Sequence, residues 1–264
     1  MSVKLIDCEE VETSEQRTKF DYFNSPEKAI LTEYFNTMPM MDNWIANLIE
    51  SYIYAFVNDS YDFGGDNKHI VKYRTKYGVM DGEYKCYYNN GNLAAEYTYK
   101  EGKLIGEGKD YYEDGNIKVE CTFEDDISNF KAYYNNGSVW VIRKRINDIL
   151  NGEYIEYWNN GNIKIHTVFK DGNKEGEYTE FYIGGEKRLK CYFIDGKKEG
   201  ICEEWYPEGT KLRVCNYKDN NMHGEYTEWY GGEIIKQKAT YEEGRRTELM
   251  KWSINGQLLE YSTF

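Results

Sequence analysis

The stretch Gly152-Glu153-Tyr154-Ile155-Glu156-Tyr157-Trp158-Asn159-Asn160-Gly161 decides the fold of this chain, because it recurs at a nearly fixed interval. Eight copies fill the chain from about Gly82 to its last residue, and they begin at Gly82, Gly106, Ser128, Gly152, Gly176, Gly200, Gly224 and Thr247. Successive copies are 24 residues apart, except for a step of 22 to Ser128 and one of 23 to Thr247. Such a period is typical of repeat arrays in which each unit contacts only its neighbours.

Each copy predicts two β-strands joined by tight turns. Asn-Asn-Gly at 159–161 supplies residues that tolerate the positive φ angles of hairpin turns. The segment after such a turn alternates with a period of two, as in Ile117, Val119, Cys121 and Phe123. This period indicates half-buried strands, and the short connections require antiparallel pairing. We therefore expect a mainly β fold, a repetitive antiparallel β-meander over residues 61–264, in which residues 61–81 form a degenerate extra copy.

Residues 1–60 differ in kind from the repeats. Ser25 before Pro26 is typical of a helix start, and Asp42 is placed to cap a second helix. In that helix the apolar residues recur at helical spacing: Trp44, Ile45, Leu48, Ile49, Tyr52, Ile53 and Phe56. We expect a small, acidic α-helical segment that caps the open first edge of the array. A partner-binding or dimerisation role is the alternative.

The third copy, residues 128–151, departs from the pattern. It is short, and it carries Trp140, Arg143, Lys144 and Arg145 where other copies alternate regularly. It is either a bend in the array or a specialised surface patch.

Composition excludes several classes of function. The formal net charge of −13 opposes direct binding to nucleic acid or to anionic lipid, and it favours a basic protein partner. No apolar run approaches membrane-spanning length, and the first residues lack the apolar stretch of a signal peptide. We expect a cytoplasmic protein.

No constellation of residues indicates catalysis, a metal or a cofactor. Cys121, Cys191 and Cys215 occupy equivalent repeat positions, roughly 10 Å apart for neighbouring copies, which is too far for a disulfide. No His lies near a Cys at zinc-ligand spacing. The three histidines lie in different copies without a nucleophile arrangement, so enzymatic activity is not expected.

One candidate binding surface follows from the repeat. The fifth position of four successive copies is a carboxylate, and an aromatic residue follows two positions later: Glu156, Glu180, Glu204 and Glu228, with Trp158, Tyr182, Tyr206 and Tyr230. On regular strands these residues share one face and form an acidic stripe beside aromatic rings, whereas the aromatic residue between them points the other way. Aromatic residues dominate binding hot spots, and carboxylates steer basic partners. The alternative is that cross-strand aromatic pairs merely stabilise a sheet without a deep core.

The phrase Gly-Glu-Tyr-x-x-Tyr-Trp-x-Asn-Gly, followed by an aromatic residue and Asp-Gly-Lys-x-x-Gly, resembles the MORN-repeat variant family over roughly residues 61–264. Its bacterial members are often described as antitoxins of the YwqK type. The resemblance implies a single twisted antiparallel sheet, often curved like a half-pipe, and no catalytic residues. It also implies immunity or antitoxin proteins that block a toxin, while other MORN arrays serve as scaffolds or lipid-associated modules.

Three functional hypotheses follow. The first is a non-enzymatic immunity or antitoxin-like inhibitor that occludes a basic toxin or nucleic-acid enzyme through the acidic, aromatic-rich face. The second is a structural or interaction scaffold, and the third is a phage anti-defence inhibitor of another nucleic-acid enzyme. Homo-oligomerisation through the C-terminal edge strand is a further expectation, because an unpaired edge can pair with another chain.

Overall fold

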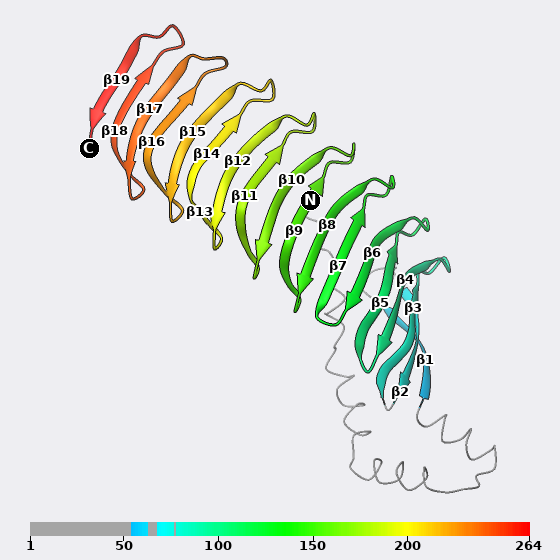
Figure 1. Ribbon diagram of the computed structural model, residues 1–264. Coiled ribbons are helices and arrows are strands. Elements are labelled where there is room, and N and C mark those ends of the chain that lie inside the picture. The colour runs from blue at the N-terminus through cyan, green and yellow to red at the C-terminus, as the bar shows by residue number, and fades with distance from the viewer. Residues whose placement is uncertain (1–53, 63–67, 77) are drawn as a thin grey trace, which may run out of the picture. The chain divides into compact units, whose positions relative to one another are not determined.

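The computed structural model describes residues 54–62, 68–76 and 78–264. The chain divides into two compact units, Met1–Leu104 and Ile105–Phe264. Within the described residues there are strands but no helix (Figure 1). The strands are β1 (Tyr54–Asp62), β2 (Lys68–Lys76), β3 (Val79–Tyr87), β4 (Leu93–Lys100), β5 (Lys103–Tyr111), β6 (Ile117–Glu124), β7 (Ile127–Tyr133), β8 (Val139–Ile146), β9 (Ile149–Tyr157), β10 (Ile163–Lys170), β11 (Asn173–Phe181), β12 (Lys187–Ile194), β13 (Lys197–Lys198), β14 (Gly200–Trp205), β15 (Lys211–Lys218), β16 (Asn221–Trp229), β17 (Ile235–Glu242), β18 (Arg245–Trp252) and β19 (Leu258–Thr263).

The first unit contains the antiparallel strands β1 to β4, paired in chain order. A small cluster of buried side chains from β2, β3 and β4 joins them: Val71, Cys86 and Ala94. The degenerate copy is therefore a hairpin like the others, and it begins at Tyr54.

The boundary between the N-terminal segment and the array needs a correction. Phe56 was expected at the end of a helix, but it lies in β1, whose partner is β2. Its aromatic and β-branched residues suit a strand, and the apolar spacing did not show where this strand begins. The other residues assigned to N-terminal helices lie outside the described part of the chain.

The second unit is a meander in which β5 to β19 pair antiparallel in chain order (Figure 1). β13 and β14 are two parts of one strand, because both pair with β12. Each copy supplies one hairpin, which confirms the predicted antiparallel β-meander of hairpin repeats.

One face of the second unit carries its core. The buried side chains come from matching positions of successive strands: Tyr178, Cys191, Phe193, Cys202, Cys215, Tyr226, Ala239 and Leu249. Their rings pack edge to face, as Tyr178 and Phe193 do at 5.6 Å between centroids. Each side chain is buried by its neighbours along the array, so the stability of one copy depends on the copies beside it.

The cysteines of this core correct another expectation. Cys191 and Cys202 form a disulfide, with their Cα atoms 4.3 Å apart. Cys191 is too far from the cysteines at the equivalent repeat position, but antiparallel pairing places Cys202, from a different repeat position, opposite it. Cys215 lies opposite Cys202 on the other side, and its thiol is free. Burial raises the pKa of the Cys215 thiol.

β-Bulges explain the repeat length. In copies that start 24 residues after the previous copy, the register between strands shifts by two residues near the phase-marking glycine. The β10–β11 and β15–β16 pairs show this shift. In the copy that starts at Thr247, the β17–β18 register shifts by one residue. In the short third copy, β6 and β7 pair without any shift. The third copy is therefore short because it lacks the bulge.

The phase-marking glycines are required by this geometry. Gly176 has a φ of +80° and Gly224 a φ of +87°, which L-residues rarely adopt. The third copy has Ser128 here, with no positive φ. A residue with a Cβ is tolerated because the strand continues straight.

A second recurring feature joins the copies at the opposite edge. The aromatic residue after each first strand donates a hydrogen bond to a main-chain carbonyl of the next copy. The distances are 2.7 Å for Tyr112 to Tyr133, 2.7 Å for Tyr134 to Tyr157, 3.1 Å for Trp158 to Phe181, 2.8 Å for Tyr182 to Trp205, 3.2 Å for Tyr206 to Trp229 and 3.1 Å for Tyr230 to Trp252. We call these bonds the inter-repeat staples.

The staples can be tested at Tyr182. Tyr182→Phe removes only the hydroxyl that donates to the Trp205 carbonyl, so we expect a loss of about 1 kcal/mol in the free energy of unfolding. Urea unfolding followed by circular dichroism measures it. Tyr192→Phe is the control, because Tyr192 is 50 % exposed and makes no side-chain hydrogen bond to the described residues. Equal stabilities of the two variants would contradict the staple.

The glycine bulge can be tested at Gly176. A Cβ there would meet nothing within 4 Å, so Gly176→Ala reports on the positive φ alone, and we expect a loss of roughly 1–2 kcal/mol. Gly231→Ala is the matched control, since Gly231 also has open space but no positive φ. Thermal unfolding compares them. A Gly176→Ala protein as stable as the control would show that the bulge does not need glycine.

Candidate functional site

The four predicted carboxylates lie where the repeat places them, on β9, β11, β14 and β16. The Tyr178 hydroxyl donates to Glu180 at 2.6 Å, and Tyr226 donates to Glu228 at 3.0 Å. Residues two apart on these strands therefore share a face, which is also the face of the core. We call Glu156, Glu180, Glu204 and Glu228 the acidic ladder.

Every carboxylate of the acidic ladder is paired with a basic side chain. Lys164 lies 2.6 Å from Glu156 and Lys236 lies 2.8 Å from Glu228, while Arg188 pairs with Glu180 and Arg213 with Glu204. The carboxylate side chains are only 14 %, 17 %, 22 % and 16 % exposed, in the order Glu156, Glu180, Glu204 and Glu228. The ladder is thus half-buried and largely neutralised within the molecule.

A second bulge lies beside the ladder in each of these copies, and the basic partner is the extra residue in three of them, whereas Arg213 lies directly opposite Glu204. The register between β9 and β10 shifts between Ile163 and Ile165, so Lys164 is the extra residue. The β16–β17 register shifts in the same way, and Lys236 is the extra residue. The sequence did not reveal this pairing, although a basic residue follows the first turn in several copies.

The ion pairs alter titration in the ladder. Burial alone would lower the pKa of Arg213, but the hydrogen bond and charge of Glu204 raise it above the ordinary value. Likewise, the hydrogen bond that Lys236 donates to Glu228 raises the pKa of Lys236. Burial raises the pKa of the Tyr178 and Tyr226 hydroxyls. All these groups keep their ordinary neutral-pH charge, so the ladder is a network of ion pairs.

The four predicted aromatic residues are the staple donors Trp158, Tyr182, Tyr206 and Tyr230. They lie in the turn after each first strand and are half-buried. Their polar atoms already bond to the next copy, so a partner would contact their ring surfaces only.

Exposed negative charge gathers instead at one edge of the array. The turn between copies holds an acidic residue with positive φ in each case: Asp125, Asp148, Asp171, Asp195, Asp219 and Glu243. All are exposed. We call this set the acidic turn edge. These residues recur visibly in the sequence, but acidic residues are also common turn formers, so their recurrence alone did not indicate an exposed charged edge.

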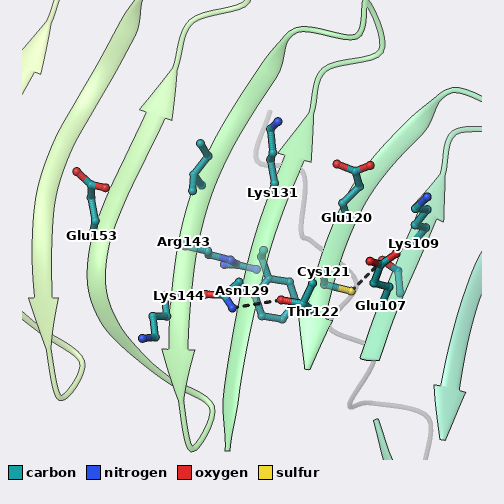
Figure 2. Close-up of a pocket in the computed structure, with 13 residues that line it drawn as sticks. Glu107, Lys109, Glu120, Cys121, Thr122, Asn129, Lys131, Arg143, Lys144 and Glu153 are labelled. Atoms are coloured by element: carbon teal, nitrogen blue, oxygen red, sulfur yellow. Dashed lines mark hydrogen bonds between the residues drawn. The ribbon is translucent and has the colours of Figure 1, made fainter. Parts of the chain in front are cut away.

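The structure also has a groove of about 520 Å³ over β5 to β9 (Figure 2). Gly108, Cys121, Phe130 and Arg143 lie along its middle, and two rows of side chains border it. One row contains Glu107, Thr122, Asn129, Lys144 and Glu153, and the other Lys109, Glu120, Lys131 and Ile142. Asn129 donates to Thr122 at 3.2 Å across the first row.

The groove extends from the second copy over the third copy, which the sequence marked as unusual. The Arg143 and Arg145 guanidinium groups lie 5.3 Å and 5.6 Å from the centre of the Phe130 ring. These residues therefore pack on an aromatic ring of their own copy. Acidic and basic groups alternate along the groove, so it offers a mixed charge rather than a binding site for one sign of ion.

Possible metal ligands were compared across the residues that the structure describes. They include no group of three or more His, Cys, Asp and Glu that could hold a metal ion. His166 lies 3.0 Å from Glu153, and both side chains are exposed. The described residues also contain no helix suited to crossing a membrane.

Comparison with known families identifies the repeat. The family model described as MORN repeat variant matches four segments, residues 80–101, 104–125, 150–171 and 198–219. No curated protein matches the chain. The matched segments follow the phase of the copies found in the sequence.

The structural role of the acidic ladder can be tested at Glu204. Glu204→Gln leaves Arg213 without its carboxylate, and we expect a loss of about 1 kcal/mol in stability. Glu225→Gln is the control, because Glu225 is exposed and makes no ion pair with the described residues; its effect should stay within roughly 0.5 kcal/mol. Urea unfolding compares the two. If Glu204→Gln lowered the stability no more than Glu225→Gln does, the ion pair would contribute little to the fold. The carboxylates of the acidic ladder would then be available to bind a partner.

Proposed function

Starting from its four MORN-variant matches, we propose that this chain is a non-enzymatic protein-binding module of the immunity or antitoxin kind. It binds a basic toxin or nucleic-acid enzyme and occludes the surface that this partner uses. The observation that carries the proposal is the repetition of exposed acidic residues at the same turn of successive copies.

The charge distribution supports a basic partner. The chain has a formal net charge of −13, and the acidic turn edge carries exposed carboxylates at a regular interval. Asp219 has a basic neighbour, Lys197, at 3.0 Å, but both side chains are more than half exposed. Such charges accelerate association with an oppositely charged surface.

The face of the acidic ladder is proposed as the contact surface beside that edge. Its aromatic residues, Trp158, Tyr182, Tyr206 and Tyr230, are held by the staples. Rigid aromatic side chains lose little conformational freedom on binding. The carboxylates of the ladder contribute to binding there when a basic residue of the partner forms the ion pair in place of Arg188 or Arg213.

A scaffold is the second candidate function. The second unit is a single layer of strands, so its two faces present different side chains to separate partners. In that case several proteins bind, and none is inhibited. An inhibitor of another nucleic-acid enzyme, such as a phage anti-defence protein, would use the same acidic surfaces as an antitoxin. Self-association through β19, where Leu259 is 63 % exposed, belongs with the scaffold.

The proposal is tested by capture of partners on the tagged full-length chain from its own cells, followed by binding kinetics. We expect one stoichiometric basic protein that high salt releases. The variant Asp171→Asn/Asp195→Asn/Asp219→Asn keeps residues that tolerate positive φ. It should lower the association rate constant roughly threefold to tenfold at low salt.

The control for charge is Glu180→Gln/Glu204→Gln/Glu228→Gln, which changes the net charge equally. Because those carboxylates are paired, we expect a smaller change in the association rate than for the turn variant. Capture of several substoichiometric proteins would favour the scaffold. If a basic partner associated with both variants at the same rate as with the unsubstituted chain, the electrostatic part of the proposal would be refuted.

A further inference from the structure

A row of aromatic side chains lies on the face opposite the core. The last residue of the first strand is Phe181 on β11, Trp205 on β14, Trp229 on β16 and Trp252 on β18. Each follows or precedes, by one residue, a side chain of the core face, so strand alternation directs it to the other side. The register places Lys187, Lys211, Ile235 and Leu258 beside these rings.

The three tryptophans of this row have unused hydrogen-bond donors. Trp205, Trp229 and Trp252 are half-buried, and their indole N–H groups have no acceptor among the residues that the structure describes. Trp158 differs, because its indole N–H donates to Phe181 in a staple. Because tryptophan is enriched at interfaces, where one end of the indole is apolar and its N–H finds a partner, these N–H groups are suited to donate to a ligand.

The distance between successive rings of the row matches the repeat length of one peptide conformation. Equivalent residues in successive copies lie two strands apart, which is about 10 Å. A polyproline II helix completes a turn every three residues, or about 9.3 Å. Every third residue of such a peptide therefore faces a successive ring when the peptide lies across the strands.

We propose that this aromatic row is a docking surface for an extended proline-rich peptide in the polyproline II conformation. The backbone carbonyls of such a peptide have no internal hydrogen-bond partners, and the three indole N–H groups can donate to them. Its proline rings pack on the aromatic faces, as in other proline-recognition grooves. The stems of Lys187 and Lys211, both exposed, provide apolar surface between the rings.

This surface is distinct from the one in the proposed function. Trp205 and Trp229 follow Glu204 and Glu228 directly in the chain and so point away from the acidic ladder. A proline-rich segment and a basic protein could bind at the same time. Single-stranded nucleic acid also stacks on aromatic rows, but a net charge of −13 opposes it.

The test is a titration of the full chain, labelled with ¹⁵N, with a polyproline peptide of about twelve residues, which spans roughly 37 Å. The six tryptophans give separate indole N–H signals in nuclear magnetic resonance spectra. We expect the signals of Trp205, Trp229 and Trp252 to shift, while that of Trp158 stays in place. A glycine–serine peptide of equal length should shift none of them.

Variants separate stacking from hydrogen bonding. Trp229→Leu should weaken binding of the polyproline peptide roughly tenfold, and Trp229→Phe, which keeps a ring, should weaken it less. Trp140→Leu is the control, because Trp140 lies outside the row and packs on Tyr134. Circular dichroism verifies that each variant is folded.

Any one of several results in the titration would overturn the proposal. They are an absence of shifts with polyproline, equal shifts at Trp158, equal effects of the two peptides, or tighter binding of an oligothymidylate of matching length. Trp229→Leu and Trp140→Leu proteins of equal affinity would also exclude this row as the docking surface.

Discussion

The hydrogen bond from a turn aromatic residue to a carbonyl of the next copy is the constraint on which the second unit depends. It recurs from Tyr112 to Tyr230 at distances between 2.7 Å and 3.2 Å. At the other edge, turn N–H groups bond to the preceding copy, as Gly196 does to Lys174 at 2.9 Å. A single layer of strands has no second layer to pack on, so contacts between neighbours must supply its order. The staples hold every copy in the same relation to the next.

The same constraint gives the two faces different properties. On one face the side chains pack on each other along the array, and Leu249 is 1 % exposed. That face must pair its carboxylates with bases, because a half-buried charge without a partner is costly. The opposite face carries half-buried aromatic rings and ion pairs of its own, such as Lys211 with Glu203 at 2.9 Å. The carboxylates of the acidic ladder are therefore less accessible than the acidic stripe in the sequence suggests.

Much of the fold was predictable from the sequence, and so was the placement of the ladder carboxylates on one face of the strands. Glu180 and Tyr178 share a face, as alternation requires, and the hairpins pair in chain order. The partners of the ladder were not predictable, because Lys164 and Lys236 reach it through bulges that a strict period of two does not anticipate. The disulfide between Cys191 and Cys202 was missed for a related reason. It joins different repeat positions, and only the pairing register brings these together.

The sequence by itself determined the repeat, its phase, the antiparallel connectivity and the faces of the side chains where the strands alternate without a bulge. These follow from local rules, since periodicity, turn residues and chain connectivity act within a few residues of each other. Only the tertiary structure decided which charges are neutralised, which aromatic residues are used as staples, and why the third copy is short. Those outcomes depend on register between strands, and a shift of one or two residues at a bulge changes every cross-strand neighbour.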